Sequence, residues 1–387
     1  MAHFDDVVTD TAVERADVEA FVADPSTVGE RFLGRYPVWT TSGTTGEPGI
    51  FLQDDRSMLA TDAAGDRWAL SAFLDRRTIA RLLRGGARIA EIAVGGHYAA
   101  ASGVELFRRE HPFLRDRMRL VSPDQPLDTI LADLQAYQPA ILVGYASVLL
   151  ELERAQRAGD LSVQPASIAP SGEPITSEEK DRLRETFGAT VREIYGATEF
   201  YGLGVECAHG DVHANTDWVV LEPVDADYRP VAPGEPAETV LLTNLANRVQ
   251  PLVRYDLGDS VTLSEERCAC DSPFPVVEVA GRQGEVLHFE TAGGESVPLF
   301  PLALTSVVKG VPGTHRFQLV KTGAATLTVR LSVESGADEA TVWSAVEAAL
   351  TDSLAAKGLE SVAVELADEP PARNSRSGKF QHVWSAV

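Results

Sequence analysis

The succession of short apolar runs and amphipathic segments in the middle of the chain restricts its fold more than any other feature. Apolar runs stand at 89–94 (IAEIAV), 140–145 (AILVGY) and 190–196 (TVREIYG). The amphipathic segments SVLLELERAQRAG and SEEKDRLRETFG lie between the second and third runs. Short buried strands that alternate with helices are typical of parallel sheets covered by helices. We therefore predict a layered α/β architecture for this region.

Two changes of pattern divide the rest of the chain. Between Asp217 and Leu263, the apolar runs WVVLEPV, TVLLTNL and PLVRYDLGDSV are separated by Pro, Gly and Asn turns and predict a mainly β subdomain. After GRQG at 281–284, strand and helix patterns continue over roughly a hundred residues, the size of a small domain. We predict a large N-terminal domain of layered sheets and helices at 1–281, a hinge at 282–284 and a small mobile α+β C-terminal domain at 285–387.

Charge and hydropathy argue against two classes of partner. The formal net charge is −23, whereas proteins that bind nucleic acid or anionic lipid need clustered Lys and Arg. No apolar stretch reaches the roughly 18 residues that a membrane-spanning helix requires. The acidic N-terminal sequence also differs from a secretory signal, which begins with a basic region. We expect a cytoplasmic protein that binds neither nucleic acid nor a membrane.

The segment TTSGTTGEPG, at 40–49, concentrates hydroxyl groups and glycines. Such a loop can surround phosphate oxygens, because glycine lets the backbone N–H groups approach closely. The spacing differs from GxxxxGK[ST], so the loop is not that of a P-loop NTPase. A plain surface loop rich in Ser, Thr and Gly is the alternative.

Five further motifs follow this loop in a fixed order. They are PSGEPIT at 170–176, YGATEF at 195–200, PLVRYDLGD at 251–259, GRQGE at 281–285 and RSGKF at 376–380. Together with TSGTTGEP, they resemble the signature motifs of the adenylate-forming superfamily. PSGEPIT and VGYASVLLEL, the latter at 143–152, are similar to its phenylacetate-CoA ligase-like branch. The resemblance spans residues 37 to 382.

The resemblance implies an AMP-forming carboxylate ligase. Such an enzyme uses ATP and Mg²⁺ to convert a carboxylic acid to an acyl-AMP, releases pyrophosphate, and then transfers the acyl group to an amine or a thiol. A complete aryl- or arylacetate-CoA ligase is one alternative. A catalytically inactive protein that binds a nucleotide or a partner is another, although retention of Glu199 and Lys379 argues against it.

The resemblance also assigns roles to residues that bind the nucleotide. Tyr195 would stack on the adenine, Asp259 would accept hydrogen bonds from the ribose hydroxyls, and Arg282 would support the ribose–phosphate end. The implied nucleotide-binding set is Ser42, Gly43, Thr44, Thr45, Gly46, Ser171, Gly172, Glu173, Pro174, Tyr195, Asp259 and Arg282. Each also has an ordinary structural interpretation, such as a turn aspartate for Asp259.

Three residues are implied in catalysis. Glu199 would hold Mg²⁺ against the phosphates, with Thr198 nearby. Lys379 would stabilise the charge that develops as the substrate carboxylate attacks the α-phosphate. A helix-terminal carboxylate and a solvated lysine near the chain end are the structural alternatives for Glu199 and Lys379. Gly284 stands where the family usually has a hinge aspartate, so control of the domain movement is an open question.

The resemblance places the acid beside VGGHYAAASG, at 94–103, where small residues would leave room for a flat group. The resemblance favours an aromatic or small hydroxy- or amino-aromatic acid, and His97 or Tyr98 could contact its carboxylate or a ring substituent. The expected substrate residues are Gly95, Gly96, His97, Tyr98, Tyr145 and Gly196. A close-packed Gly/Ala crossing with an exposed histidine is the alternative.

All three cysteines fall in one arrangement with a histidine. Cys207 and His213 lie in one segment, and Cys268 and Cys270 in another. Three thiolates and one imidazole could close a tetrahedral structural Zn²⁺ site. His209 is the alternative fourth ligand, and buried small hydrophobic cysteines are the alternative to a metal site.

The acyl acceptor is less clear from the sequence. ETAGGES, at 290–296, would place Glu290 and Glu295 near the expected route of the CoA thiol. Like charge disfavours CoA, which carries several phosphates. A small amine or a carrier-protein thiol is therefore an acceptor to consider beside CoA, unless ETAGGES is merely an exposed hairpin.

Overall fold

The N-terminal segment folds as a small unit at one end of the molecule. The computed structural model describes residues 4–41, 49–72, 76–123, 125–264, 266–282, 286–294, 296–299, 301–373 and 380–387. A three-stranded sheet in the order β1-β2-β3 packs with two helices and a short 3₁₀ helix. These elements are α1 (Phe4–Val7), α2 (Arg15–Ala23), η1 (Pro25–Thr27), β1 (Arg31–Phe32), β2 (Tyr36–Thr40) and β3 (Ile50–Leu52).

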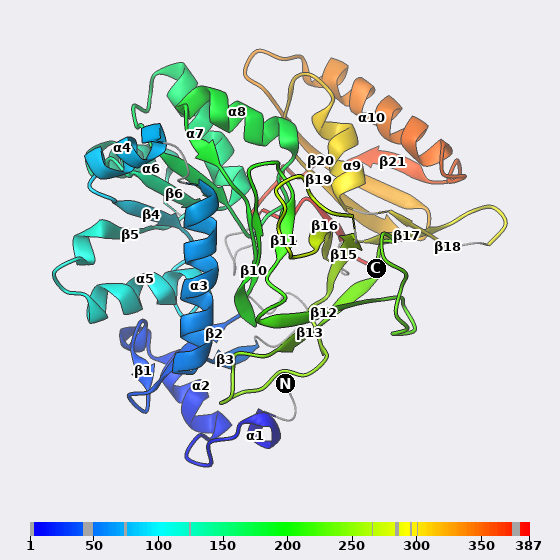
Figure 1. Cartoon of the computed structure of the whole chain (residues 1–387). Coiled ribbons are helices and arrows are strands. Elements are labelled where there is room, and N and C mark those ends of the chain that lie inside the picture. Colours follow the sequence, from blue (N-terminus) through cyan, green and yellow to red (C-terminus); the bar gives the residue numbers. More distant parts are fainter. Residues whose placement is uncertain are drawn as a thin grey trace.

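A five-stranded parallel sheet in the order β5-β4-β6-β7-β8 forms the centre of the molecule (Figure 1). Its strands are β4 (Ile89–Ile92), β5 (Met118–Val121), β6 (Ile141–Gly144), β7 (Ser167–Pro170) and β8 (Thr190–Val191). The largest hydrophobic core forms between one face of this sheet and α6, α7 and α8. Trp68 of α3 packs on the other face, against Ile141 and Val143.

Helix α8 begins and ends at caps that the sequence supplies. For α8, Thr176 accepts a hydrogen bond from the Glu179 amide, while the Glu179 carboxylate accepts one from the Thr176 amide. Gly188 then ends α8 with a left-handed backbone. The helices are α3 (Asp55–Ala72), α4 (Arg76–Arg84), α5 (Ala99–Glu110), η2 (Arg115–Arg117), α6 (Leu127–Tyr137), α7 (Ala146–Ala158) and α8 (Ser177–Phe187).

Two antiparallel sheets follow. The first has the order β15-β16-β11-β10-β9, and the second the order β12-β13-β14. Their strands are β9 (Ile194–Ala197), β10 (Phe200–Glu206), β11 (Val212–Ala214), β12 (Val219–Val224), β13 (Thr239–Asn244), β14 (Tyr255–Asp256), β15 (Asp259–Ser264) and β16 (Val276–Arg282). Apolar side chains of both sheets share one core.

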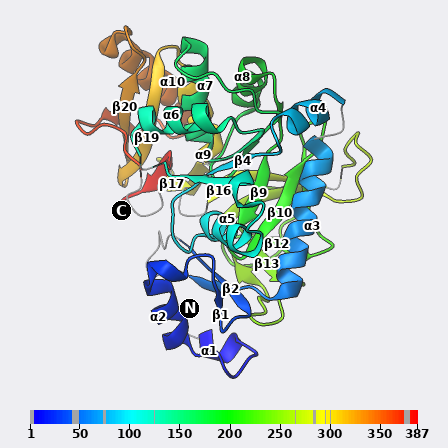
Figure 2. The ribbon, with the colours of Figure 1, turned by 90° about the vertical axis from the view of Figure 1, so that its left-hand side faces the viewer.

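The C-terminal region forms its own core, whose buried members all lie between Leu287 and Val383. A four-stranded sheet in the order β21-β20-β19-β22 packs with two helices, and β17 pairs with β18 in a hairpin. The elements are β17 (Leu287–Glu290), β18 (Ser296–Leu299), α9 (Pro301–Lys309), β19 (Thr314–Gly323), β20 (Thr326–Val333), α10 (Glu339–Ala355), β21 (Ala363–Leu366) and β22 (Val383–Ser385). This region and the N-terminal segment lie at opposite ends of the molecule (Figure 2).

The predicted fold class, a mixed α/β architecture with layered sheets, is confirmed. The boundaries at 281 and 285 stay predictions, and Gly284 lies outside the described residues. ETAGGES joins the paired strands β17 and β18, with Glu290 opposite Ser296, while Glu295 lies outside the described residues and the effect of the segment on CoA stays a prediction. None of the helices in the described part of the chain has the length and apolar character needed to cross a bilayer.

Candidate active site

Two of the predicted nucleotide motifs lie side by side. Ser171, just after β7, forms a parallel bridge with Ile194 at the start of β9. This pairing places the 170–176 loop next to the 195–200 segment, beyond the carboxyl end of β7. Ligands of open α/β sheets bind at this edge. Gly172 has a φ of 72°, which a residue with a Cβ rarely adopts, so the loop needs glycine there.

Tyr195 and Asp259 meet although they are 64 residues apart in the chain. The Tyr195 hydroxyl donates a hydrogen bond of 2.9 Å to Oδ2 of Asp259, and both side chains are buried. Gly196 follows, where a Cβ would lie 2.2 Å from the carbonyl oxygen of Tyr201. The structure thus brings the predicted adenine and ribose residues together, while their roles stay predictions.

Thr198 and Glu199 form the turn between β9 and β10. The Glu199 side chain is buried, and its main-chain carbonyl accepts a hydrogen bond of 3.1 Å from Asn244 Nδ2. This turn follows Tyr195 directly, so the predicted Mg²⁺ ligand lies at the same edge as the predicted nucleotide residues. Binding of Mg²⁺ by Glu199 stays a prediction.

Glu173 joins the nucleotide loop to the C-terminal end of the chain. Its Oε2 accepts a hydrogen bond of 2.8 Å from the Ser147 amide at the start of α7. Its Oε1 accepts one of 2.6 Å from the Phe380 amide. Phe380 follows Lys379 in the sequence, so the segment that carries the predicted catalytic lysine ends against the nucleotide loop.

Several predicted site residues lie outside the described part of the chain. They are Ser42, Gly43, Thr44, Thr45, Gly46 and Lys379, and the side chain of Arg282 is likewise not described. The ends of the phosphate loop are placed, since the Thr41 amide donates to the Gly49 carbonyl at 3.0 Å. The Gly49 amide donates to Thr41 Oγ1 at 2.7 Å. The loop therefore begins and ends at one point of the β2–β3 hairpin.

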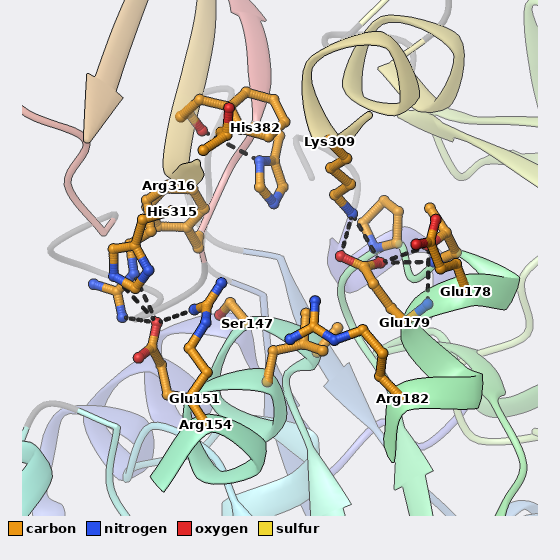
Figure 3. Close-up of a pocket in the computed structure, with 17 residues that line it drawn as sticks. Ser147, Glu151, Arg154, Glu178, Glu179, Arg182, Lys309, His315, Arg316 and His382 are labelled. Carbon is orange, nitrogen blue, oxygen red and sulfur yellow. Dashed lines mark hydrogen bonds and ion pairs between the residues drawn. The ribbon is translucent and has the colours of Figure 1, made fainter. Parts of the chain in front are cut away.

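We call the parallel sheet with α6, α7 and α8 the central domain, and the region from Leu287 to Val383 the C-terminal domain. A pocket of about 120 Å³ lies between them, bordered by Pro174 and Phe380. Lys309 of α9 reaches Glu179 of α8 with its Nζ 2.9 Å from a carboxylate oxygen, as Figure 3 shows. Arg316 of β19 lies 2.8 Å from Oε1 of Glu151 of α7. These two ion pairs connect the domains.

Burial and neighbouring charges shift the pKa values of titratable groups in this pocket. Burial opposes ionisation of Glu179, but Lys309 and the Thr176 hydrogen bonds outweigh it and lower the pKa of Glu179. Burial lowers the pKa of His382 to about 3, so its ring is neutral near pH 7. Sequence reasoning missed this set of residues, because only the Thr176–Glu179 spacing gives a local signal, and that signal is a helix cap.

The predicted acid segment is partly open. A Cβ on Gly95 or Gly96 would have no heavy atom of the described residues within 4 Å. The backbone of Tyr98 forms a parallel β-bridge with Thr40, the last residue of β2, and the phosphate loop follows β2 in the sequence. His97 is buried rather than exposed, with Nε2 3.0 Å from Thr27 Oγ1. Burial lowers its pKa. Its predicted contact with the acid stays a prediction.

Cys207, His213, Cys268 and Cys270 form one cluster in which all ligand atoms lie within 4.8 Å of one another. The Sγ atoms of Cys207 and Cys268 are 3.7 Å apart, and Sγ of Cys270 is 3.2 Å from Nε2 of His213. Nδ1 of His213 is 2.8 Å from the Phe274 carbonyl, a contact that orients Nε2 toward the cysteines. His209, the alternative ligand, is exposed and lies outside this cluster.

The comparison with curated sequences gives partial matches. No family model matches the chain. It is 27% identical over 189 residues to phenylacetate-coenzyme A ligase of Thermus thermophilus, covering 46% of this chain and 41% of the relative. It is 29% identical over 135 residues to protein CapK of Staphylococcus aureus, covering 34% of this chain and 28% of CapK. The matches span less than half the length of either relative.

Solved structures match nearly the whole chain. The 2-hydroxyisobutyryl-CoA ligase in its postadenylation state, in complex with 2-HIB-AMP, has a TM-score of 0.64 at 18% identity. That match covers 97% of this chain and 79% of the other. The anthranilate CoA ligase AuaEII in complex with anthranoyl-AMP has a TM-score of 0.60 at 14% identity, covering 89% and 65%. Likeness at these identities shows a shared fold.

Proposed function

We propose that this chain, which has the fold of the adenylate-forming superfamily, uses ATP to activate a carboxylic acid as an acyl-AMP. The observation that carries the proposal is the meeting of four segments of the chain at one edge of the parallel sheet. The 170–176 loop pairs with the start of β9, Tyr195 bonds to Asp259, and Glu173 holds Phe380 beside the loop. The named relatives support it, since they include CoA ligases in complex with acyl-AMP.

In this proposal the protein supplies position and charge, and no side chain acts as a nucleophile. An oxygen of the substrate carboxylate attacks the α-phosphorus of ATP, the bond to the bridging oxygen breaks, and pyrophosphate leaves. Tyr195 and Asp259 bind the adenosine end, and Lys379 stabilises the charge that builds up at the α-phosphate. Bound Mg²⁺, held by Glu199, would neutralise the phosphates.

The acyl group then passes to a nucleophile, whose thiol or amine attacks the acyl carbonyl and displaces AMP. The relatives whose names identify them as CoA ligases favour the CoA thiol as acceptor. An amine or carrier thiol is the alternative from the sequence. We propose an aromatic acid as the substrate, on the resemblance to phenylacetate-CoA ligase and the open space over Gly95 and Gly96.

Acid-dependent exchange of radiolabelled pyrophosphate into ATP tests the proposal directly. Exchange should require Mg²⁺ and a carboxylic acid, and Lys379→Ala should abolish it while leaving ATP binding within a few-fold of wild type. Exchange by Lys379→Ala at the wild-type rate would exclude the role of this lysine. Failure of a broad panel of acids to support exchange by the wild-type protein would contradict the proposed activity.

The Cys/His cluster is proposed to hold one structural Zn²⁺. Three thiolates and one imidazole match the ligand set of closed zinc sites, and the 3.7 Å sulfur separation agrees with the edge of a tetrahedron whose Zn–S bonds are about 2.3 Å. Such a site leaves no open coordination position, so the ion would stabilise the β subdomain and take no part in adenylation.

A further inference from the structure

Glu91 is a buried acidic residue on β4, which lies between β5 and β6 in the parallel sheet. Its neighbours in the sheet are Leu120 and Val143. Side chains alternate along a strand, and those of Ala90 and Ile92 belong to the core with α6 and α7. Glu91 therefore shares its face with Val143, which packs with Trp68 of α3 and Val205 of β10. The carboxyl lies between the parallel sheet and the β10 sheet.

Aromatic residues surround this carboxyl. The Tyr201 hydroxyl of β10 donates a hydrogen bond to Glu91. Tyr145, immediately after β6, interacts electrostatically with Glu91, with Tyr98 of the predicted acid segment and with Glu173 of the nucleotide loop. Tyr145 therefore lies within electrostatic range of Glu91, of the predicted acid segment and of the nucleotide loop.

The Glu91 carboxyl and the Trp39 indole of this cluster can both make further hydrogen bonds. A carboxylate offers about four acceptor positions, and among the described residues Tyr201 is the one side chain that bonds to Glu91, with no cation paired to it. Trp39 of β2 packs edge-on against Tyr201, with ring centroids 6.3 Å apart. Its Nε1 is buried and has no partner in the described chain. Unsatisfied buried polar groups are rare and destabilising unless a ligand completes them.

We propose that Glu91 is the specificity-determining residue of the acid pocket and selects acids that carry a hydroxyl or amino group. This inference rests on the proposed adenylation function. The substituent donates a hydrogen bond to an oxygen of the Glu91 carboxyl group, which can accept in either protonation state, and a hydroxyl oxygen can in addition accept one from Trp39 Nε1. The carboxylate of the acid then points toward the nucleotide loop, past Tyr145.

A pocket built around a buried acceptor discriminates strongly. It rejects an analogue without the donor by about 10⁴-fold or more, because the acceptor then stays unpaired, whereas an apolar pocket separates such analogues by only about 100-fold. For the wild-type protein we therefore expect the kcat/KM of a hydroxy or amino acid to exceed that of its unsubstituted parent by about 10⁴-fold, well beyond the roughly 100-fold of an apolar pocket.

The experiment uses matched acids and matched variants of the full chain. The acids are benzoate and phenylacetate with their ortho, meta and para hydroxy and amino derivatives. The variants are Glu91→Gln, which retains an acceptor, and Glu91→Leu, which removes it. Glu278→Gln makes the same chemical change at an exposed position of β16 and serves as the control. Pyrophosphate exchange gives kcat/KM, and calorimetry measures binding of the same acids without catalysis.

We expect the preference for the best donor-bearing acid over its parent to fall at least about 100-fold in Glu91→Leu and less in Glu91→Gln. It should not change in Glu278→Gln. An unchanged preference in a folded Glu91→Leu protein would overturn the inference and leave the proposed adenylation intact. Binding that depends on Glu91, without exchange by any acid, would instead contradict adenylation and support Glu91 as the selecting residue. A protein that neither binds nor adenylates these acids would overturn both.

Discussion

A carboxyl group buried without a cation makes the free energy of unfolding depend on pH, and Glu91 is such a group. Burial raises its pKa to about 7, and the Tyr201 hydrogen bond offsets only part of this effect. Between pH 4.5 and 7 the folded protein keeps a proton that the unfolded chain loses. Because the folded state then binds more protons, stability falls as the pH rises through this window, by about 3 kcal/mol in total.

Glu91→Gln tests this linkage, since glutamine resembles the protonated carboxyl and cannot ionise. The variant should gain stability over wild type progressively from about pH 4.5 to 7, and the difference should stay constant above that range. Urea unfolding monitored by tryptophan fluorescence at several pH values measures it. A stability difference that does not vary with pH would show that the pKa of Glu91 is not raised.

Variants of Asp259 and Tyr195 can separate ribose binding by Asp259 from the support that the Tyr195 hydroxyl gives to the Asp259 carboxylate. Asp259→Ala removes the predicted acceptor of the ribose hydroxyls and should raise the Kd for ATP at least about tenfold, since charge-assisted hydrogen bonds contribute about 1.5–3 kcal/mol. Tyr195→Phe removes only the 2.9 Å hydrogen bond and should raise it less. Calorimetric titration with ATP decides, and equal ATP affinity in Asp259→Ala and wild type would exclude the ribose role.

At this scale the sequence predicted the residues that belong to recognisable motifs and missed those that do not. Tyr195 and Asp259 stand in separate motifs, and the structure joins them. Glu91 stands alone in the apolar run IAEIAV, where one acid looks like an interruption of a buried strand. Its partner Tyr201 comes from a strand of another sheet, and no local pattern reports that contact.

At the scale of elements, the Cys/His cluster connects two loops of the β10 sheet. Cys207 and His213 flank the β10–β11 turn, whereas Cys268 and Cys270 lie between β15 and β16. The spacing of the four residues predicted this grouping, because metal ligands usually come in close pairs from two segments. His213 was the predicted fourth member and His209 the alternative, and the cluster contains His213.

The protein prepared without chelator should contain about one zinc per chain, and removing the ion should lower the melting temperature before it affects adenylation. Cys268→Ser should lose the metal, whereas His209→Ala should retain it. Elemental analysis and calorimetric melting measure both effects. Zinc-free protein of full stability would exclude the site, and loss of zinc in His209→Ala would exclude His213 as the sole imidazole ligand.

At the scale of the whole molecule, ion pairs hold the C-terminal domain against the central domain. Lys309–Glu179 and Arg316–Glu151 both cross this boundary and are partly buried. The order of the sequence motifs predicted the architecture, because each motif marks a known part of one fold. It gave no indication of these pairs, whose members lie 130 and 165 residues apart.

Lys309→Ala should slow pyrophosphate exchange about fivefold, because one contact that holds the domains in this arrangement is lost and partly buried pairs contribute about 1 kcal/mol. Arg157→Ala removes an ion pair within α7, between Arg157 and Glu153, and should leave the rate unchanged. Steady-state exchange assays and small-angle X-ray scattering compare the variants. An unaltered rate together with an unaltered scattering profile would exclude a role for Lys309 in domain closure.

The carboxylate of Glu179 takes part in both the cap of α8 and the ion pair between the domains. It completes the hydrogen-bonded start of α8, through the Thr176 amide at 2.8 Å, and it receives Lys309 from the other domain. In the domain movement that the sequence predicts, the carboxylate would keep its place at the helix but would lose its counter-ion and gain water. Solvent would then reach the first turn of α8, so deuterium uptake by the amides of Thr176 and Glu179 would report each opening of the molecule from within the larger domain.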